Sequence, residues 1–196
     1  EELKQTHPNV LDYRYELAAT YAWVGVGFFP WQRPVAEPDA ESSLGMALAE
    51  SRWLMEQNPS IPQYACSTAL ILAKLAEIRA RAGEYEEAEP LFREALGIQE
   101  AAIARFPELP LHHQVLGEFM RTKLGQTMLK QYGGSDAREP LEEAKASLET
   151  SVARLTQLTD HEEIADDRLA EAALPMACET LRETLAELGE DSMSTP

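Results

Sequence analysis

Cysteine is scarce in this sequence, where Cys66 and Cys178 are the only two among 196 residues. Two thiols cannot build the disulfide framework of a small secreted domain or a zinc site with four cysteine ligands. Both lie within apolar helical patterns, where a free cysteine behaves as a small apolar side chain. We therefore predict that both cysteines belong to the core.

Long apolar runs are also missing. The longest, Tyr21 to Trp31, is interrupted by glycine and proline and is much shorter than the about 20 residues that span a bilayer. The chain begins with Glu1 and has no basic and apolar leader. We expect that Glu1 continues a longer protein, that this segment does not insert into a membrane, and that it is cytoplasmic. The extracytoplasmic side stays open if a transmembrane helix precedes Glu1.

Lysine and arginine are also scarce. The chain has 17 lysines and arginines against 34 aspartates and glutamates, a net charge of −17. Phosphate groups would be repelled over most of such a surface, which argues against nucleic acid and anionic membranes as partners. We expect a protein or peptide partner, and the overall charge favours a basic one.

Alternating strand patterns are absent, and every regular segment has helical periodicity. What the sequence does contain is a repeat. The junctions HPNVLDY, NPSIPQY and FPELPLH place Pro8, Pro59 and Pro107 at intervals of 51 and 48 residues. Glu89-Pro90-Leu91 recurs 50 residues later as Glu139-Pro140-Leu141. Each period therefore predicts one helical hairpin.

The repeat predicts one all-α domain over residues 1–189, an antiparallel array of about seven helices stacked as hairpins. The expected units are 8–57, 59–105 and 107–158, followed by capping helices over 160–189 and a flexible tail over 190–196. Asp160 and Glu163 resemble a capping box that would open the last helical segment. Gly189 is expected to end it.

The segment GEYEEAEPLFREAL shows how neighbouring helices are expected to meet. Ala88, Phe92 and Ala95 fall on one face of the helix, as a small, a large and a small apolar side chain. A notched face of this kind suits close packing against another helix better than it suits holding a substrate.

This pattern resembles the tetratricopeptide repeat, although the period is near 50 residues rather than the usual 34. The run HPNVLDYRYELAATYAWVG resembles, more closely, the long-period tetratricopeptide regions behind the kinase domain of planctomycete-type bacterial serine/threonine protein kinases. The resemblance covers roughly residues 1–158 and implies a docking or sensory segment beside a signalling domain. The sequence itself has no kinase motif. The residues that match the repeat pattern are Leu75, Ala76, Gly83, Tyr85, Ala88, Phe92 and Ala95.

The resemblance further implies that the first helix of each hairpin lines a concave groove. In the family's register, Ala73 and Thr122 would also face inward. Where the family's carboxylate-clamp members carry Lys and Asn, this chain has Ala22, Ala73 and Val26, so that activity is not expected. An extended or helical peptide is the expected ligand. The candidate partner-binding residues are Ala22, Val26, Phe29, Trp31, Glu77, Arg81, Phe119, Gln126 and Lys130.

Catalytic chemistry has little support in the sequence. His112 and His113 are neighbours on one helix, with only Glu118 at ligand spacing, and the acids around His161 lack a calcium-type loop. We predict no enzyme activity, no catalytic or metal residues and no cofactor. Two alternatives stay open: metal-assisted hydrolysis at these histidines and acids, and formation of a homo-oligomer through the stripe Leu181, Leu185 and Leu188.

Overall fold

In the computed structural model, every regular element among the described residues is a helix, which confirms the predicted all-α class. The structure describes residues 10–26, 37–164 and 167–190, apart from the side chains of residues 23–26, 37 and 38. Phe29 and Trp31 lie outside these ranges. Seven α-helices and one 3₁₀ helix occur in the described residues: α2 (Leu11–Val26), α3 (Glu37–Gln57), α4 (Pro62–Arg81), α5 (Tyr85–Arg105), α6 (His112–Tyr132), α7 (Arg138–Thr159), η1 (Glu162–Ile164) and α8 (Arg168–Leu188).

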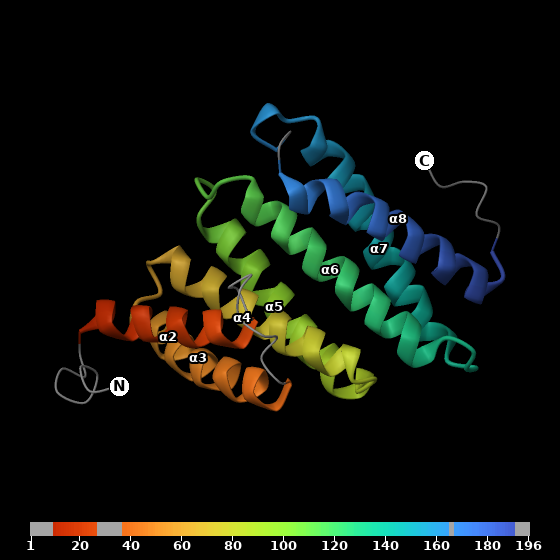
Figure 1. Ribbon diagram of the computed structural model, residues 1–196. Coiled ribbons are helices and arrows are strands. Elements are labelled where there is room, and N and C mark those ends of the chain that lie inside the picture. The colour runs from red at the N-terminus through yellow and green to blue at the C-terminus, as the bar shows by residue number, and fades with distance from the viewer. Residues whose placement is uncertain (1–9, 27–36, 165–166, 191–196) are drawn as a thin grey trace.

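The helices pair along the chain into the hairpins α2/α3, α4/α5 and α6/α7, and α8 packs against both helices of the last hairpin. Successive hairpins stack side by side, so α4, α6 and α8 run in the same direction (Figure 1). No helix among the described residues has the length and apolar character needed to cross a membrane.

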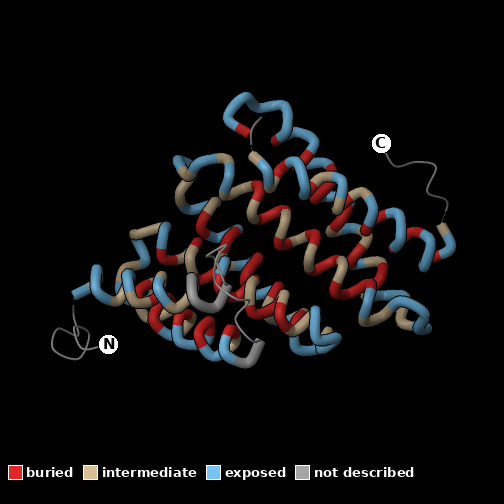
Figure 2. Tube along the Cα trace, in the orientation of Figure 1, coloured by how far each residue is buried: buried red, intermediate tan, exposed pale blue. Residues whose placement is uncertain are grey.

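The core lies where the helices of neighbouring hairpins meet, as the buried positions in Figure 2 show. Ala88, Phe92 and Ala95 are 0%, 1% and 0% exposed. They belong to a cluster with Leu72 on α4 and Met120 on α6. The notched face predicted from the sequence is therefore a helix-packing face. Of the two cysteines, Cys66 is buried as expected, whereas Cys178 is half-buried.

Glycines with positive φ end two of the helices. Gly83 has φ +83° in the turn between α4 and α5, and Gly189 has φ +74° directly after α8. Side chains rarely adopt this left-handed conformation, which glycine reaches without steric cost. The predicted end of the last helix at Gly189 is confirmed.

A third glycine, Gly125, permits close contact between α6 and α7. A Cβ atom built at this position would lie 2.8 Å from Cγ of Leu148 and 2.9 Å from its Cδ2. Leu148 is fully buried in a cluster with Val115, Val152 and Leu155. The leucine therefore has little room to move away from an added methyl group.

We predict that Gly125→Ala lowers the free energy of unfolding by about 1 kcal/mol, because overpacking outweighs the better helix propensity of alanine. The matched control is Gly97→Ala on α5, where an added Cβ meets no atom within 4 Å. There the propensity gain should act alone and raise stability by about 0.5 to 1 kcal/mol. Urea unfolding of both variants checks the prediction, and equal signs for the two changes would contradict it.

The start of the last helix differs from the prediction. Helix α7 continues to Thr159, so Asp160 follows a helix end and does not open a new helix. Asp167 is the N-cap of α8: its Oδ1 accepts hydrogen bonds from the backbone N–H of Leu169 at 2.8 Å and of Ala170 at 3.3 Å. The prediction of a capping box at Asp160 and Glu163 was wrong. Both acids lie in the connection between α7 and α8, where Glu163 belongs to η1.

Asp167 also ties α8 to α6, since its Oδ2 lies 2.5 Å from Nδ1 of His112. Partial burial raises the pKa of Asp167, but hydrogen bonds from His112 and from the backbone N–H of Leu169 and Ala170 outweigh burial and lower it. A carboxylate with a lowered folded-state pKa stabilises the fold above its unfolded pKa and loses this effect as pH falls through the folded pKa.

We therefore predict that Asp167→Asn lowers the free energy of unfolding by about 1 kcal/mol at pH 7. The difference from the unmodified protein should shrink towards zero as pH falls below about 4. Urea titrations from pH 7 to pH 3 test this, with Asp160→Asn as the control for which no change is expected. A difference for Asp167→Asn that stays constant over this range would refute the role of its charge.

Candidate functional site

A cleft of about 620 Å³ lies between α4 and α6, the first helices of two neighbouring hairpins. Phe92 and Tyr85 of α5 contribute to its lining from behind the two helices, and Glu183 of α8 lies at its margin. We call this hollow the α4/α6 cleft. Its remaining lining residues are Lys74, Glu77, Ala80, Arg81, Phe119, Lys123, Gln126, Thr127, Leu129 and Lys130.

The cleft exists because α4 and α6 barely touch, whereas α6 and α8 pack closely. Fully buried Ala173 and Ala177 of α8 belong to the core that α8 shares with α6 and α7, and Gln126 of α6 donates a hydrogen bond to Oγ1 of Thr180 at 3.1 Å. The facing part of α4 carries long charged side chains such as Lys74 and Arg81. Burying these charges between helices would cost far more than leaving them hydrated. This gap therefore stays open.

The two walls of the cleft carry equivalent positions of the repeat. Lys74 and Lys123 are 49 residues apart, and the same interval separates Glu77 from Gln126 and Arg81 from Lys130. Each wall thus has a cation, a polar residue three positions later and a second cation after four more. The two cations of each wall are seven residues apart, which places them on one helix face with a rise of about 10 Å between them.

Hydrogen bonds within each wall hold part of this charge in place. Lys74 Nζ lies 3.0 Å from Glu77 Oε2 on α4, and Lys123 Nζ donates to Gln126 Oε1 at 3.2 Å on α6. The ammonium of Lys123 also lies 5.4 Å from the ring centroid of Phe119. The polar lining is therefore partly ordered, with an aromatic ring beside it.

Five of the nine candidate partner-binding residues meet at this cleft: Glu77, Arg81, Phe119, Gln126 and Lys130 all line it. Ala22 does not. It is half-buried, packs against the α3/α4 part of the core and borders a smaller hollow of about 160 Å³ between α2 and α4. The side chain of Val26 and all of Phe29 and Trp31 lie outside the described residues.

The inward-facing positions predicted for the first helices were wrong by one residue at one point on each wall. Ala73 and Thr122, expected to face inward, are 3% and 0% exposed and belong to the helix packing. Their next neighbours, Lys74 and Lys123, line the cleft instead. One position corresponds to a rotation of about 100° around a helix. The signal that could have found both lysines is their position three residues before Glu77 and Gln126.

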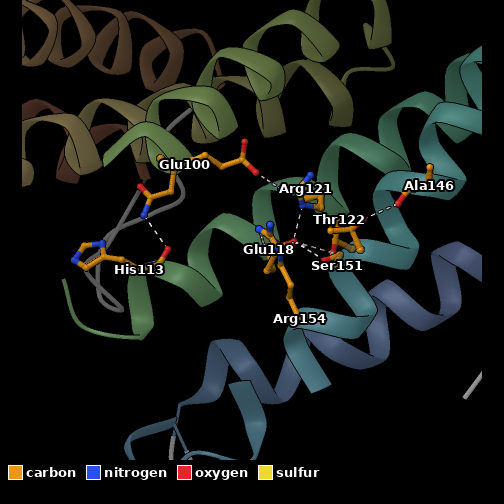
Figure 3. A network of polar contacts seen from close by, with 10 residues as sticks. Glu100, His113, Glu118, Arg121, Thr122, Ala146, Ser151 and Arg154 are labelled. Carbon is orange, nitrogen blue, oxygen red and sulfur yellow. Dashed lines mark hydrogen bonds and ion pairs between the residues drawn. The ribbon is translucent and has the colours of Figure 1, made fainter. Parts of the chain in front are cut away.

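A second, more polar hollow of about 720 Å³ opens beside α5 and α7, where Glu118, Arg154 and His161 are among its lining residues. Glu118 is only 4% exposed. Its Oε2 accepts from Nε of Arg121 at 2.9 Å and its Oε1 from Nη1 of Arg154 at 3.0 Å (Figure 3). Both carboxylate oxygens of Glu118 therefore already have cationic partners, and Glu100, the other acid of this lining, pairs with Arg121.

Hydrogen bonds of hydroxyl groups and of the Glu118 backbone add further contacts between α6 and α7 around Glu118. Ser151 donates to the carbonyl oxygen of Glu118 at 3.1 Å, and Oγ1 of Thr122 lies 3.1 Å from Oγ of Ser151. We call Glu118, Arg121, Thr122, Ser151 and Arg154 the Glu118 network. Glu118 and Arg121 pair within α6, and the contacts of Ser151 and Arg154 join α7 to α6, which identifies the network as a structural joint of this hairpin.

The histidines considered for catalysis are separated by their contacts. His112 pairs with Asp167, whereas His113 is turned into the protein, where burial and then the nearby His112 lower its pKa. Glu118, the acid at ligand spacing, is held by two arginines. Within the described residues, no group of three or more histidine, cysteine, aspartate or glutamate side chains is placed to hold a metal ion.

The leucine stripe considered for self-association is part of the core. Leu181, Leu185 and Leu188 are 3%, 8% and 7% exposed. The first two belong to the cluster shared by α6, α7 and α8, and Leu188 packs with Leu129 and Leu141. A contact between copies through this stripe would require α8 to leave the chain's own core.

Comparison of the chain with known protein families, with curated proteins and with solved structures finds no match in any of the three.

Proposed function

We propose that this chain is a non-catalytic interaction module that binds a segment of a partner protein in the α4/α6 cleft. The observation that carries the proposal is the meeting of Glu77, Arg81, Phe119, Gln126 and Lys130, from two separate hairpins, around one hollow. Its volume of about 620 Å³ falls within the range of ligand sites, about 300 to 1,000 Å³.

The lining combines features that suit a peptide. Phe92 and Leu129 are buried residues that give the cleft an apolar part, and Phe119 is half-buried beside them. Polar and charged groups line both walls, where they could meet backbone amides and side chains of a bound segment. A mixture of an apolar anchor and a polar border is typical of sites that bind protein segments.

The resemblance to the regions behind bacterial serine/threonine kinase domains suggests the context of this binding. In that setting, the module would be the docking or regulatory part of a larger signalling protein, and its ligand would be a substrate, a regulator or another part of the same protein. The gene sequence before the codon of Glu1 tests this context, because a kinase domain encoded there would support it.

Selection of random twelve-residue peptides on the purified protein, followed by affinity measurement, tests the proposal. Peptides that use the cleft should bind Phe119→Ala at least about tenfold more weakly, because the variant loses the half-exposed ring from the lining; tenfold corresponds to 1.4 kcal/mol. Phe106→Ala is the matched control, since Phe106 is also half-buried but does not line the cleft. Circular dichroism checks that both variants fold.

Two results would overturn the proposal. The first is the failure of repeated selections to yield any peptide that binds. The second is a set of peptides whose affinity falls equally in Phe119→Ala and Phe106→Ala, or in neither variant, which would place binding elsewhere on the molecule.

A further inference from the structure

We propose that the α4/α6 cleft is specific for an acidic segment, with carboxylates that pair with Arg81, Lys123 and Lys130 around an apolar side chain held by Phe119. This inference rests on the proposed function and adds the chemistry of the ligand. It runs against the overall charge of −17, which taken alone favours a basic partner.

The first supporting observation is where the unpaired cations lie. In a chain with twice as many acids as bases, ten of the fifteen described lysines and arginines have a carboxylate partner, including Arg52, Arg79 and Arg93. Within the described ranges, the lysines and arginines that form no ion pair are Arg81, Arg105, Lys123, Lys130 and Arg168. Three of these five line the α4/α6 cleft.

The contacts of these three cations leave donors available. Arg81 donates only from Nε, to the backbone carbonyl of Glu77 at 3.3 Å, and its side chain is otherwise exposed. Lys123 donates to the neutral amide of Gln126. Lys130 is exposed and forms no side-chain hydrogen bond with the described residues. Ammonium and guanidinium groups with free N–H donors are the usual partners of carboxylates.

The acids at the cleft do not cancel this charge. Glu77 is matched by Lys74 on the same wall, 3.0 Å away. Glu183 of α8 is the other acid of the lining, and it forms no ion pair with described residues. Three unpaired cations therefore face one unpaired acid, so the lining is locally positive.

Local charge decides contacts inside the cleft, because charges further away than about 8 to 10 Å are largely screened at physiological salt. The negative surface elsewhere would slow the approach of an acidic segment without cancelling its contacts once bound. Lys123 and Lys130 lie about 10 Å apart along α6, a distance that about three residues of an extended chain span. A segment with acids on both sides of one large apolar residue therefore fits the positions of the cations and of Phe119.

Binding of three labelled peptides tests this inference. The first peptide contains two glutamates, leucine, phenylalanine and two further glutamates between glycine and serine flanks; the others replace all four glutamates with glutamine or with lysine. The peptides that bind in the random selection are also scored for net charge. The acidic peptide should bind at least tenfold more tightly than the glutamine peptide, and the lysine peptide should bind most weakly.

Two double variants with the same change in net charge locate the effect. Lys123→Gln with Lys130→Gln should weaken binding of the acidic peptide at least tenfold and leave the glutamine peptide within about twofold. Arg105→Gln with Arg168→Gln removes two equally unpaired cations away from the cleft and should leave both peptides unchanged. Equal losses in the two double variants would show an effect of net charge alone and would overturn the inference.

The outcomes separate this inference from the proposed function. If selected peptides depend on Phe119 but are neutral or basic, the binding module stands and its acidic specificity is wrong. If no peptide depends on Phe119, both proposals fail.

Discussion

Phe92→Ala is expected to lower the free energy of unfolding by about 3 to 5 kcal/mol, the largest effect of any single substitution considered for this chain. The ring is 1% exposed and sits among Leu72, Ala76, Met120 and Met128. These side chains come from α4 and α6, on either side of α5, so the cavity left by alanine would lie between three helices. Urea unfolding followed by circular dichroism measures the loss.

The same ring also borders the α4/α6 cleft, which makes Phe119→Ala an informative comparison. Phe119 is half-buried, and its removal should cost about 1 to 2 kcal/mol of stability while weakening peptide binding. Phe92→Ala should instead cause a large loss of stability, and the fraction that stays folded should lose less peptide affinity than Phe119→Ala does. A cost of less than about 1 kcal/mol for Phe92→Ala would mean that α5 does not join its two neighbours as described.

The position of Phe92 could be predicted because its pattern is local. Small residues at Ala88 and Ala95 on the same helix face indicate a helix that packs closely, and both are fully buried. The hairpin period was equally accessible, because proline and glycine mark helix ends wherever they occur. These two signals were enough to predict the fold class.

The faces of the first helices could be predicted only approximately. Glu77 and Gln126 line the cleft as expected, but Ala73 and Thr122 were assigned in place of Lys74 and Lys123. Rotation of a helix about its own axis is fixed by the neighbours it packs against, which periodicity alone does not define. A lysine beside an alanine gives no sign of which of the two faces the open side.

Ion pairs between residues far apart in the sequence could not be predicted either, because they also depend on how the helices pack. Arg154 and Glu118 are 36 positions apart in the sequence, yet their side chains lie 3.0 Å from one another. The sequence offered Glu118 only as an acid near two histidines. Which cations have partners, and therefore which are left for a ligand, follows from the stacking of the hairpins and could be learned only from the structure.

The cleft itself follows from a difference between two otherwise equivalent contacts. Helices α6 and α8 pack closely, and α8 contributes buried alanines to the core shared with α6 and α7, whereas the α4–α6 gap is lined by residues too polar to bury. A repeat protein can thus keep one gap open by changing the inward residues of a single helix. The same few positions set the packing of α4 and the side chains that a ligand of the proposed site would meet.

Glu118→Ala is the second large expected effect, a loss of about 3 kcal/mol in the free energy of unfolding. The carboxylate is 4% exposed and accepts from both Arg121 and Arg154. Removing it leaves Arg121, whose side chain is 13% exposed, with Glu100 as its remaining acidic partner. Arg154 has a 54% exposed side chain and can be hydrated, so most of the cost should come from Arg121 and the joint between α6 and α7.

Glu143→Ala is the matched control, because Glu143 also accepts two hydrogen bonds from one arginine, Arg93, but has a 56% exposed side chain. Such an exposed pair is worth at most about 1 kcal/mol. Double-mutant cycles should show stronger coupling of Glu118 with Arg121 than with Arg154, since water replaces the lost partner only at the exposed guanidinium. Equal costs for Glu118→Ala and Glu143→Ala would contradict the assignment of the Glu118 network as a buried joint, because burial is the main difference between the two sites.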